Sequence, residues 1–123
     1  MDNQHEKLNY VEFGSMNLEA TKEFFTAAFG WRFTDYGPEY CAFDQQGLEG
    51  GFYAANKAAT QAAGSALLVF YSNDLEATRS KVDSQGGEIS KEIFDFPGGR
   101  RFHFTEPGGN EFGVWSDMPA LNA

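Results

Sequence analysis

The sequence predicts an α+β fold made of two tandem βαβββ units. The first observation is a repeat: Leu-Glu-Ala-Thr occurs at residues 18–21 and again at residues 75–78, an offset of 57 in a chain of 123 residues. Each copy follows a capping-type residue, Asn17 or Asp74, and precedes a glycine at the same distance. The second observation is that three short β-rich segments follow each copy. The alternative is that two good helix starts resemble each other by chance.

Each copy of the repeat is expected to begin a helix. Asn17 caps the first helix, which runs to about Phe29, and Gly30 ends it because glycine accepts a positive φ. Asp74 caps the second helix, which Gly86-Gly87 stops. The residues expected to form the buried stripes have helical spacing: Thr21, Phe24, Phe25 and Ala28 in the first helix, and Leu75, Thr78 and Val82 in the second.

Eight strands are expected, and the first of each unit precedes the helix. Period two places Tyr10 and Glu12 on one face of the first strand and Val11 and Phe13 on the other, which we expect to meet a helix. The face with Glu12 is either part of a site or exposed to solvent. The expected strands are 7–14, 31–36, 40–44, 51–54, 66–71, 88–94, 101–105 and 111–115.

The length is suited to one domain, residues 1–123. Residues 56–65 are small and polar without an apolar stripe, which is typical of a linker. The expected division is therefore a first module over about 7–55, this linker, a second module over about 66–116, and a tail over 117–123.

Composition limits the possible partners. The net charge of −9 argues against a nucleic-acid partner, which requires a basic face, and tolerates a cationic ligand. The thirteen phenylalanines can hold helices on a sheet and still leave rings to line a cavity. Cys41 is the only cysteine, so no intrachain disulfide can form. The polar N-terminal residues and the absence of a long apolar run predict no membrane partner and a cytoplasmic location.

Further motifs accompany the repeat. Phe29-Gly30-Trp31 closes the first helix, and Glu106-Pro107-Gly108-Gly109-Asn110 precedes a last strand that ends at Trp115. In this order and spacing the chain resembles the vicinal oxygen chelate superfamily, which includes glyoxalase I, extradiol dioxygenases and bleomycin-resistance proteins. Within it, the chain is similar to the small lactoylglutathione-lyase-related proteins. Its last turn is similar to the family's Asp-Pro-x-Gly-Asn, with Glu106 in place of the aspartate.

The resemblance implies a curled mixed sheet with a cleft, helices on the outside and a homodimer. The thin stripe of the second helix also favours a dimer, since it leaves apolar sheet to be covered. In the metal enzymes of the family, His, Gln or Glu side chains from the first and last strands of each module hold a divalent ion. These positions fall here on Tyr10, Leu67, Gly113 and the stretch 50–53. Leucine and glycine side chains cannot coordinate a metal, so we expect no standard metal site and no cofactor.

A divergent metal site is the alternative to this expectation. The side chains that could form it are Glu12, Glu49, His103 and Glu111.

The resemblance also places a set of aromatic, apolar and acidic residues in the cleft. Such a wall suits a small organic ligand that is aromatic or cationic. The alternative is that the rings simply fill the cleft. The expected ligand-binding residues are Tyr10, Glu12, Phe52 (or Tyr53), Leu67, Val69, Tyr71, Glu111 and Trp115.

The expected function is therefore that of a small-molecule-binding protein of the glyoxalase/bleomycin-resistance type, without the standard metal. The first alternative is an enzyme of the same superfamily, a lactoylglutathione-lyase-like lyase or isomerase, or a dioxygenase-like enzyme. Its catalytic candidates are Glu12 and His103, which could form an acid–base pair if they lie within hydrogen-bond reach. The second alternative is an assembly module with a filled cleft.

Overall fold

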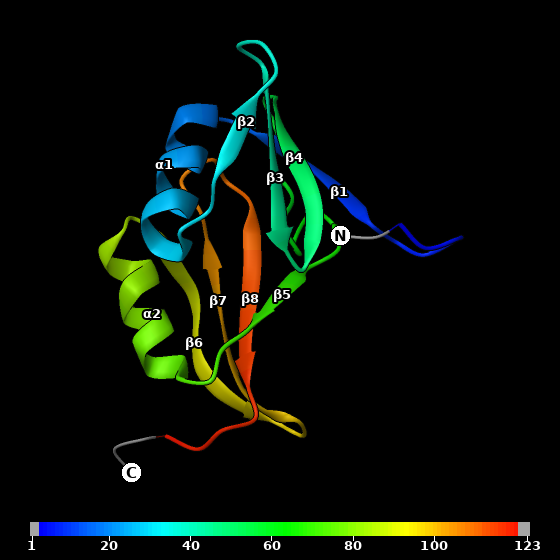
Figure 1. Cartoon of the computed structure of the whole chain (residues 1–123). Helices are drawn as coiled ribbons and strands as arrows, with labels where there is room; N and C mark the ends of the chain where they lie inside the picture. The colour runs from blue at the N-terminus through cyan, green and yellow to red at the C-terminus, as the bar shows by residue number, and fades with distance from the viewer. Residues whose placement is uncertain (1–2, 121–123) are drawn as a thin grey trace.

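The computed structural model describes residues 3–120, which form two sheets and two helices (Figure 1). The last three residues of the expected tail lie outside the described residues. The elements are β1 (Tyr10–Ser15), α1 (Leu18–Phe29), β2 (Phe33–Asp35), β3 (Tyr40–Gln46), β4 (Leu48–Ala54), β5 (Leu68–Tyr71), α2 (Leu75–Ser84), β6 (Glu88–Phe96), β7 (Gly99–Thr105) and β8 (Glu111–Ser116). This order is βαβββ repeated twice, so the predicted α+β class and tandem modules are confirmed.

The two modules form separate four-stranded sheets. Sheet A has the strand order β1-β4-β3-β2 and sheet B the order β5-β8-β7-β6. In both sheets the strand before the helix pairs in parallel with the last strand of its module, and the other pairs are antiparallel. Within residues 3–120 no strand pair joins sheet A to sheet B, so the arrangement is open rather than a closed barrel.

Both helices begin where the sequence predicts, and α1 also packs as predicted. The side chain of Asn17 accepts a hydrogen bond from the N–H of Ala20 (3.1 Å), and Asp74 caps α2 in the same way. Gly30 ends α1 with a φ of 71°. The predicted stripe of α1 is buried, whereas α2 buries only Leu75 and Val82. None of the helices among residues 3–120 is long and apolar enough to cross a membrane.

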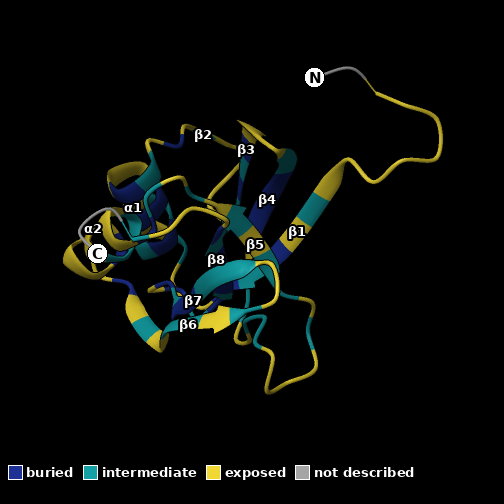
Figure 2. Ribbon diagram, turned by 90° about the horizontal axis from the view of Figure 1, so that it is seen from below, coloured by how far each residue is buried: buried dark blue, intermediate teal, exposed yellow. Residues whose placement is uncertain are grey.

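The first strand is shorter than expected. It begins at Tyr10 rather than Lys7, and Tyr10, opposite Glu49, is the first residue that pairs with β4. Residues 3–9 instead run away from the sheets as an exposed segment (Figure 2), and Leu8 is 92% exposed. The other strands differ from the predicted ranges by one to three residues at their ends.

The core is a cluster of aromatic rings, and α1 packs against both sheets. Phe25 is fully buried, and its ring lies 5.6 Å from that of Phe52 in sheet A and 5.4 Å from that of Phe112 in sheet B. It also stacks on Trp31 at 4.4 Å. Both helices lie on the same side of the two sheets (Figure 1), and the buried residues gather between helices and strands (Figure 2). Aromatic burial therefore joins the two modules into one core.

Phe52 corrects one prediction. The sequence placed Phe52, or alternatively Tyr53, in the ligand cleft, but Phe52 is fully buried and its ring stacks on Phe13 at 5.2 Å. The register explains the difference, because Phe52 lies opposite Phe13, whose face meets the helix as predicted. Alternation along β4 then turns Gly51 and Tyr53 toward the opposite face, and Tyr53 is 45% exposed.

A buried polar network fixes the start of α1 against the β7–β8 turn. Thr21 donates a hydrogen bond from Oγ1 to Oε1 of Glu106 (2.8 Å), and the N–H of Gly108 donates to the same oxygen (2.5 Å). Asn110 donates from Nδ2 to the other carboxylate oxygen and to the backbone carbonyl of Gly14, each at 2.7 Å. Because the proton of Thr21 goes to Glu106, Ser15 must donate to Thr21 (2.7 Å). Burial raises the pKa of the Glu106 carboxyl, and these donors oppose that rise.

The second module repeats half of this network. Ser72 and Thr78, each 57 positions after Ser15 and Thr21, form the same hydroxyl pair at 2.7 Å. Among the hydrogen bonds of residues 3–120, no carboxylate joins this second pair. The duplication therefore supplies two equivalent threonines in different surroundings.

Replacing these threonines tests the network. We expect Thr21→Ala to lower the free energy of unfolding by about 2–3 kcal/mol, because it removes one donor from the buried carboxylate and the acceptor of the Ser15 hydroxyl. The matched control Thr78→Ala should cost less than about 1 kcal/mol. Urea unfolding measures both values. Equal losses for the two variants would contradict a special role for the carboxylate.

Candidate functional site

The outer face of sheet A, the face turned away from the helices, carries a chain of hydrogen bonds. Tyr40 donates to Oε2 of Glu12 (2.9 Å), and the hydroxyl of Tyr10 lies 2.5 Å from that of Tyr40. Burial, followed by these two hydrogen bonds, raises the pKa of Tyr40 well above its usual range, so it stays a protonated donor. Tyr10 must therefore donate to Tyr40, since the single proton of Tyr40 goes to Glu12.

Gly51 provides the space for this chain. It lies opposite Glu12 in the parallel pair of β1 and β4, and a Cβ built at Gly51 would collide with the phenol oxygen of Tyr40. Any larger residue would push the ring of Tyr40 aside. The glycine therefore lets Tyr40 lie across the centre of sheet A and reach Glu12.

The outer face of sheet B carries a second polar chain, centred on His103. The register places His103 opposite Gly113 and Arg101 opposite Trp115, so all four share this face. Arg101 donates from Nε to Nε2 of His103 (3.1 Å), while Nδ1 of His103 lies 3.8 Å from Oε2 of Glu111. Because Arg101 can only donate, Nε2 must be unprotonated and the imidazole carries its proton on Nδ1, facing the carboxylate.

Glu111 is held in place from the other side. The backbone N–H of Gln61 in the linker donates to its Oε1 (2.8 Å), and the hydroxyl of Ser90 donates to its Oε2 (3.5 Å). Burial, reinforced by the nearby charge of Arg101, lowers the pKa of His103 below its usual value of 6.5. His103 is thus neutral at neutral pH and lies between a fixed carboxylate and a guanidinium.

Aromatic rings surround this chain. The guanidinium of Arg101 lies over Phe96 at 5.5 Å from the ring centre, and the ammonium of Lys91 lies over Phe94 at 4.7 Å. Trp115 packs edge-on against Phe96 (6.3 Å). The outer face of sheet B therefore combines two cations with an aromatic floor.

A cavity of about 690 Å³ opens at the junction of the two sheets. Its volume is in the range of small-molecule sites, and its walls are mostly apolar. They include residues from the helix-facing side of sheet A and from β5. The lining residues are Val11, Phe13, Trp31, Phe43, Gln46, Gly47, Leu48, Leu67, Leu68, Val69, Phe70, Tyr71 and Phe112.

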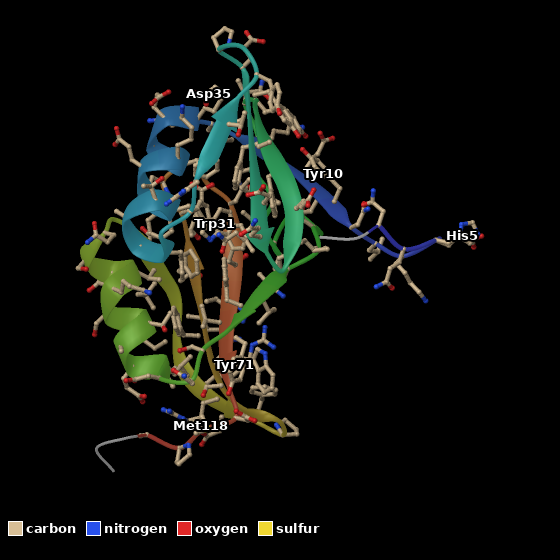
Figure 3. The ribbon with its side chains drawn as sticks, in the orientation of Figure 1. His5, Tyr10, Trp31, Asp35, Tyr71 and Met118 are labelled. Carbon is tan, nitrogen blue, oxygen red and sulfur yellow. The ribbon has the colours of Figure 1, made fainter. Side chains whose placement is uncertain are left out.

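Apart from Phe52, which lies in the core, the expected ligand-binding residues are distributed over three places. Tyr10 and Glu12 lie on the outer face of sheet A, and Glu111 and Trp115 lie on that of sheet B. Figure 3 shows Tyr10 well separated from Tyr71, which belongs to the cavity. The other two expected residues of the cavity wall are Leu67 and Val69.

The two candidate catalytic residues have separate surroundings. Glu12 binds Tyr40 on sheet A, whereas His103 contacts Arg101 and Glu111 on sheet B. No hydrogen bond or ion pair of residues 3–120 joins Glu12 to His103, so this geometry gives no support to an acid–base pair between them.

Sequence reasoning did not identify Tyr40 and Arg101. Period two gives a signal for Arg101, since it places Arg101 on the same face as His103 two residues later. Tyr40 could be found only with the register of β3 and β4, which brings Ala42 opposite Gly51 and leaves the phenol free to cover the glycine.

The side chains present do not fit the divalent ion that the resemblance implies. The positions expected to supply ligands hold Tyr10, Leu67, Gly113 and the stretch 50–53 of β4, in which the phenol of Tyr53 is the one possible ligand. Among residues 3–120 no group of three or more His, Cys, Asp and Glu side chains is placed to hold a metal. Cys41 is fully buried, and burial raises the pKa of its thiol to about 11, so it is no nucleophile at neutral pH.

Sequence comparison identifies the family. The model of the Glyoxalase/Bleomycin resistance protein/Dioxygenase superfamily matches residues 7–114. The chain therefore belongs to this superfamily, and the resemblance expected from its motifs is confirmed. No curated protein sequence matches the chain.

Solved structures share the fold at low sequence identity. A glyoxalase-related enzyme from Fulvimarina pelagi is 17% identical, with a TM-score of 0.72 over 90% of this chain and 88% of that one. A glyoxalase/bleomycin resistance protein/dioxygenase family enzyme from Burkholderia phytofirmans PsJN is 15% identical, with a TM-score of 0.73 over 89% and 98%. Lactoylglutathione lyase from Agrobacterium tumefaciens is 14% identical, with a TM-score of 0.68 over 93% and 96%. These similarities concern the fold alone.

The protonation of His103 can be measured directly. We expect its imidazole to titrate below pH 6.5, with the neutral form protonated on Nδ1. Because the folded pKa is lowered, its contribution to stability is present above pH 6.5 and is lost as the pH falls through the folded value. Arg101→Gln should raise the pKa by removing a nearby positive charge. Nitrogen-detected NMR titration, with His103→Gln to assign the resonances, measures both; titration above pH 6.5 would contradict the arrangement.

Proposed function

We propose that this chain is a small-molecule-binding protein of the glyoxalase/bleomycin-resistance type, acting without the family's standard metal. The observation that carries the proposal is the outer face of sheet A. There the Glu12 carboxylate lies beside phenol rings, and Tyr10 and Tyr53 are about half exposed. Aromatic faces and a carboxylate favour a flat, cationic organic ligand through stacking and cation–π contact.

The hydrogen-bond chain supports this proposal because it fixes the site before a ligand arrives. Tyr40 holds Glu12 in one orientation, and Tyr10 holds Tyr40. A ligand that meets an ordered carboxylate has less side-chain entropy to remove on binding.

Binding of a planar cation tests the proposal. We expect 1-methylquinolinium to bind more tightly than its uncharged isostere 1-methylnaphthalene, and Glu12→Gln to weaken only the cation, by about tenfold. Glu23→Gln on the exposed side of α1 is the control, since it changes the net charge equally. Isothermal titration gives the affinities. A ligand at a hundred times its Kd should also raise the free energy of unfolding by about 2.7 kcal/mol, which a thermal-shift assay detects. Equal weakening by both variants would count against the site.

We further propose that the chain forms a homodimer, as the family resemblance implies, and that it acts in the cytoplasm. The outer edges of β1 and β5 have no partner strand among residues 3–120, and α2 buries few residues. Both features leave surface that a second copy could cover. Sedimentation velocity at micromolar concentration should give twice the 13.6 kDa chain mass. A species of monomer mass under these conditions would overturn this proposal.

The second candidate function is a lyase or isomerase, or a dioxygenase-like enzyme, with a divergent site. The ordered carboxylate–imidazole–guanidinium chain on sheet B favours it, because it fixes the tautomer of His103. Metal analysis of the purified protein separates the candidates. Stoichiometric divalent metal that is lost on His103→Ala would favour the enzyme and would overturn the metal-free proposal.

A further inference from the structure

The guanidinium of Arg101 is held in place without being neutralised. Its Nε donates to His103, and its plane lies over Phe96. None of the hydrogen bonds of residues 3–120 uses its Nη1 or Nη2, and the side chain is partly exposed. Gly113 leaves the space for this position, because a Cβ there would lie 3.2 Å from Nη2. The N–H groups on Nη1 and Nη2 of the guanidinium are therefore available to a ligand.

The other arginines of the sheet B module are paired with acids. Arg79 binds Glu92, and Arg100 binds Glu76. Within residues 3–120 Arg101 forms no ion pair, although the chain has 18 acidic residues and a net charge of −9. Arg101 therefore differs from the other two arginines of its module, since its guanidinium is positioned by His103 and Phe96 and has no acidic partner among residues 3–120, which suggests a site for an external anion.

Glu111 shares this face but does not neutralise Arg101. The linker N–H of Gln61 fixes one of its carboxylate oxygens, and the other faces Nδ1 of His103. His103 lies between the two charges, with Nε2 toward the guanidinium and Nδ1 toward the carboxylate. Lys91 lies opposite His103 in the β6–β7 pair, forms no ion pair with any described residue, and adds a second positive charge.

From these contacts we propose that Arg101 binds the carboxylate group of an aromatic small molecule on the outer face of sheet B. The planar fork matches a carboxylate with two parallel hydrogen bonds. Phe96 and Trp115 provide ring surface beside it for the aromatic part. The inference rests on the proposed small-molecule binding but not on the cation site of sheet A.

A single carboxylate fits better than a phosphate group. Arg101 and Lys91 supply one guanidinium and one ammonium to this site, and the fixed charge of Glu111 lies close to it. A doubly charged group would need more donors and would be repelled by that carboxylate. Inorganic phosphate is therefore a suitable competitor in the test.

The experiment compares 2-naphthoate with the uncharged 2-naphthamide by isothermal titration of the full chain. We expect naphthoate to bind at least about tenfold more tightly, and Arg101→Gln to remove that advantage while leaving naphthamide within about twofold. Arg101→Lys should retain part of the advantage, because it keeps the charge without the fork. Arg32→Gln, at an exposed arginine elsewhere, removes the same charge and should leave naphthoate binding unchanged.

A second readout locates the ligand. Naphthoate should shift the NMR resonances of His103, which contacts Arg101, in the wild-type chain and not in Arg101→Gln. Thermal unfolding of each variant confirms that it is folded. Arg101→Lys keeps the test decisive if Arg101→Gln does not fold.

Several outcomes would overturn the inference. Equal affinities for naphthoate and naphthamide would show that the carboxylate is not recognised, and equal losses in Arg101→Gln and Arg32→Gln would show only a general charge effect. Displacement of naphthoate by equimolar phosphate would overturn the assigned ligand class. If neither naphthalene compound binds but 1-methylquinolinium does, the inference fails and the proposed function stands; if none of the three binds, both fail.

Discussion

The fold depends on one buried carboxylate. Glu106 is 1% exposed and sits between the β7–β8 turn and the start of α1. It accepts hydrogen bonds from Thr21, Gly108 and Asn110, and Asn110 also reaches the carbonyl of Gly14 at the end of β1. A carboxylate in this position is tolerated only because several donors replace its lost water. These donors come from both modules, so the same interactions that satisfy the buried charge also hold the modules together.

Two glycines leave space for side chains on the outer faces of the two sheets. Glycines at Gly51 and Gly113 occupy the centres of the two outer faces, and each is covered by side chains from the neighbouring strand. On sheet A the cover is a phenol bound to a carboxylate, and on sheet B it is an imidazole bound to a guanidinium. The two outer faces therefore carry different groups: Glu12 with phenol groups on sheet A, and His103 between Arg101 and Glu111 on sheet B. The hydroxyl pairs at the starts of the two helices, Ser15 with Thr21 and Ser72 with Thr78, are in contrast repeated at the same distance.

The repeat in the sequence was sufficient to predict the helices, their caps and the order of strands. Each of these depends on local periodicity and on capping residues such as Asn17 and Asp74. The site depended on register, which local patterns specify poorly. The pairing of β4 with β1 decides which residues of β4 face the core, and it places Phe52 there rather than in the cleft. Tyr40 was missed for the same reason, since its importance follows from a glycine on another strand. The partners of His103 required the pairing of β7 with β8.

The position of α1 also determines the order in which the chain can fold. Phe24 packs against Phe104, and Phe25 packs against Phe112, each roughly eighty or more residues later in the sequence. The hydrogen-bond acceptor of Thr21 is 85 residues away. During synthesis the first module therefore leaves the ribosome with its helix uncovered on one side, and its burial is completed only when β7 and β8 emerge. Such long-range closure slows folding and favours a single late, cooperative step over the independent folding of two halves. The chain is thus built as a repeat but folds as one unit.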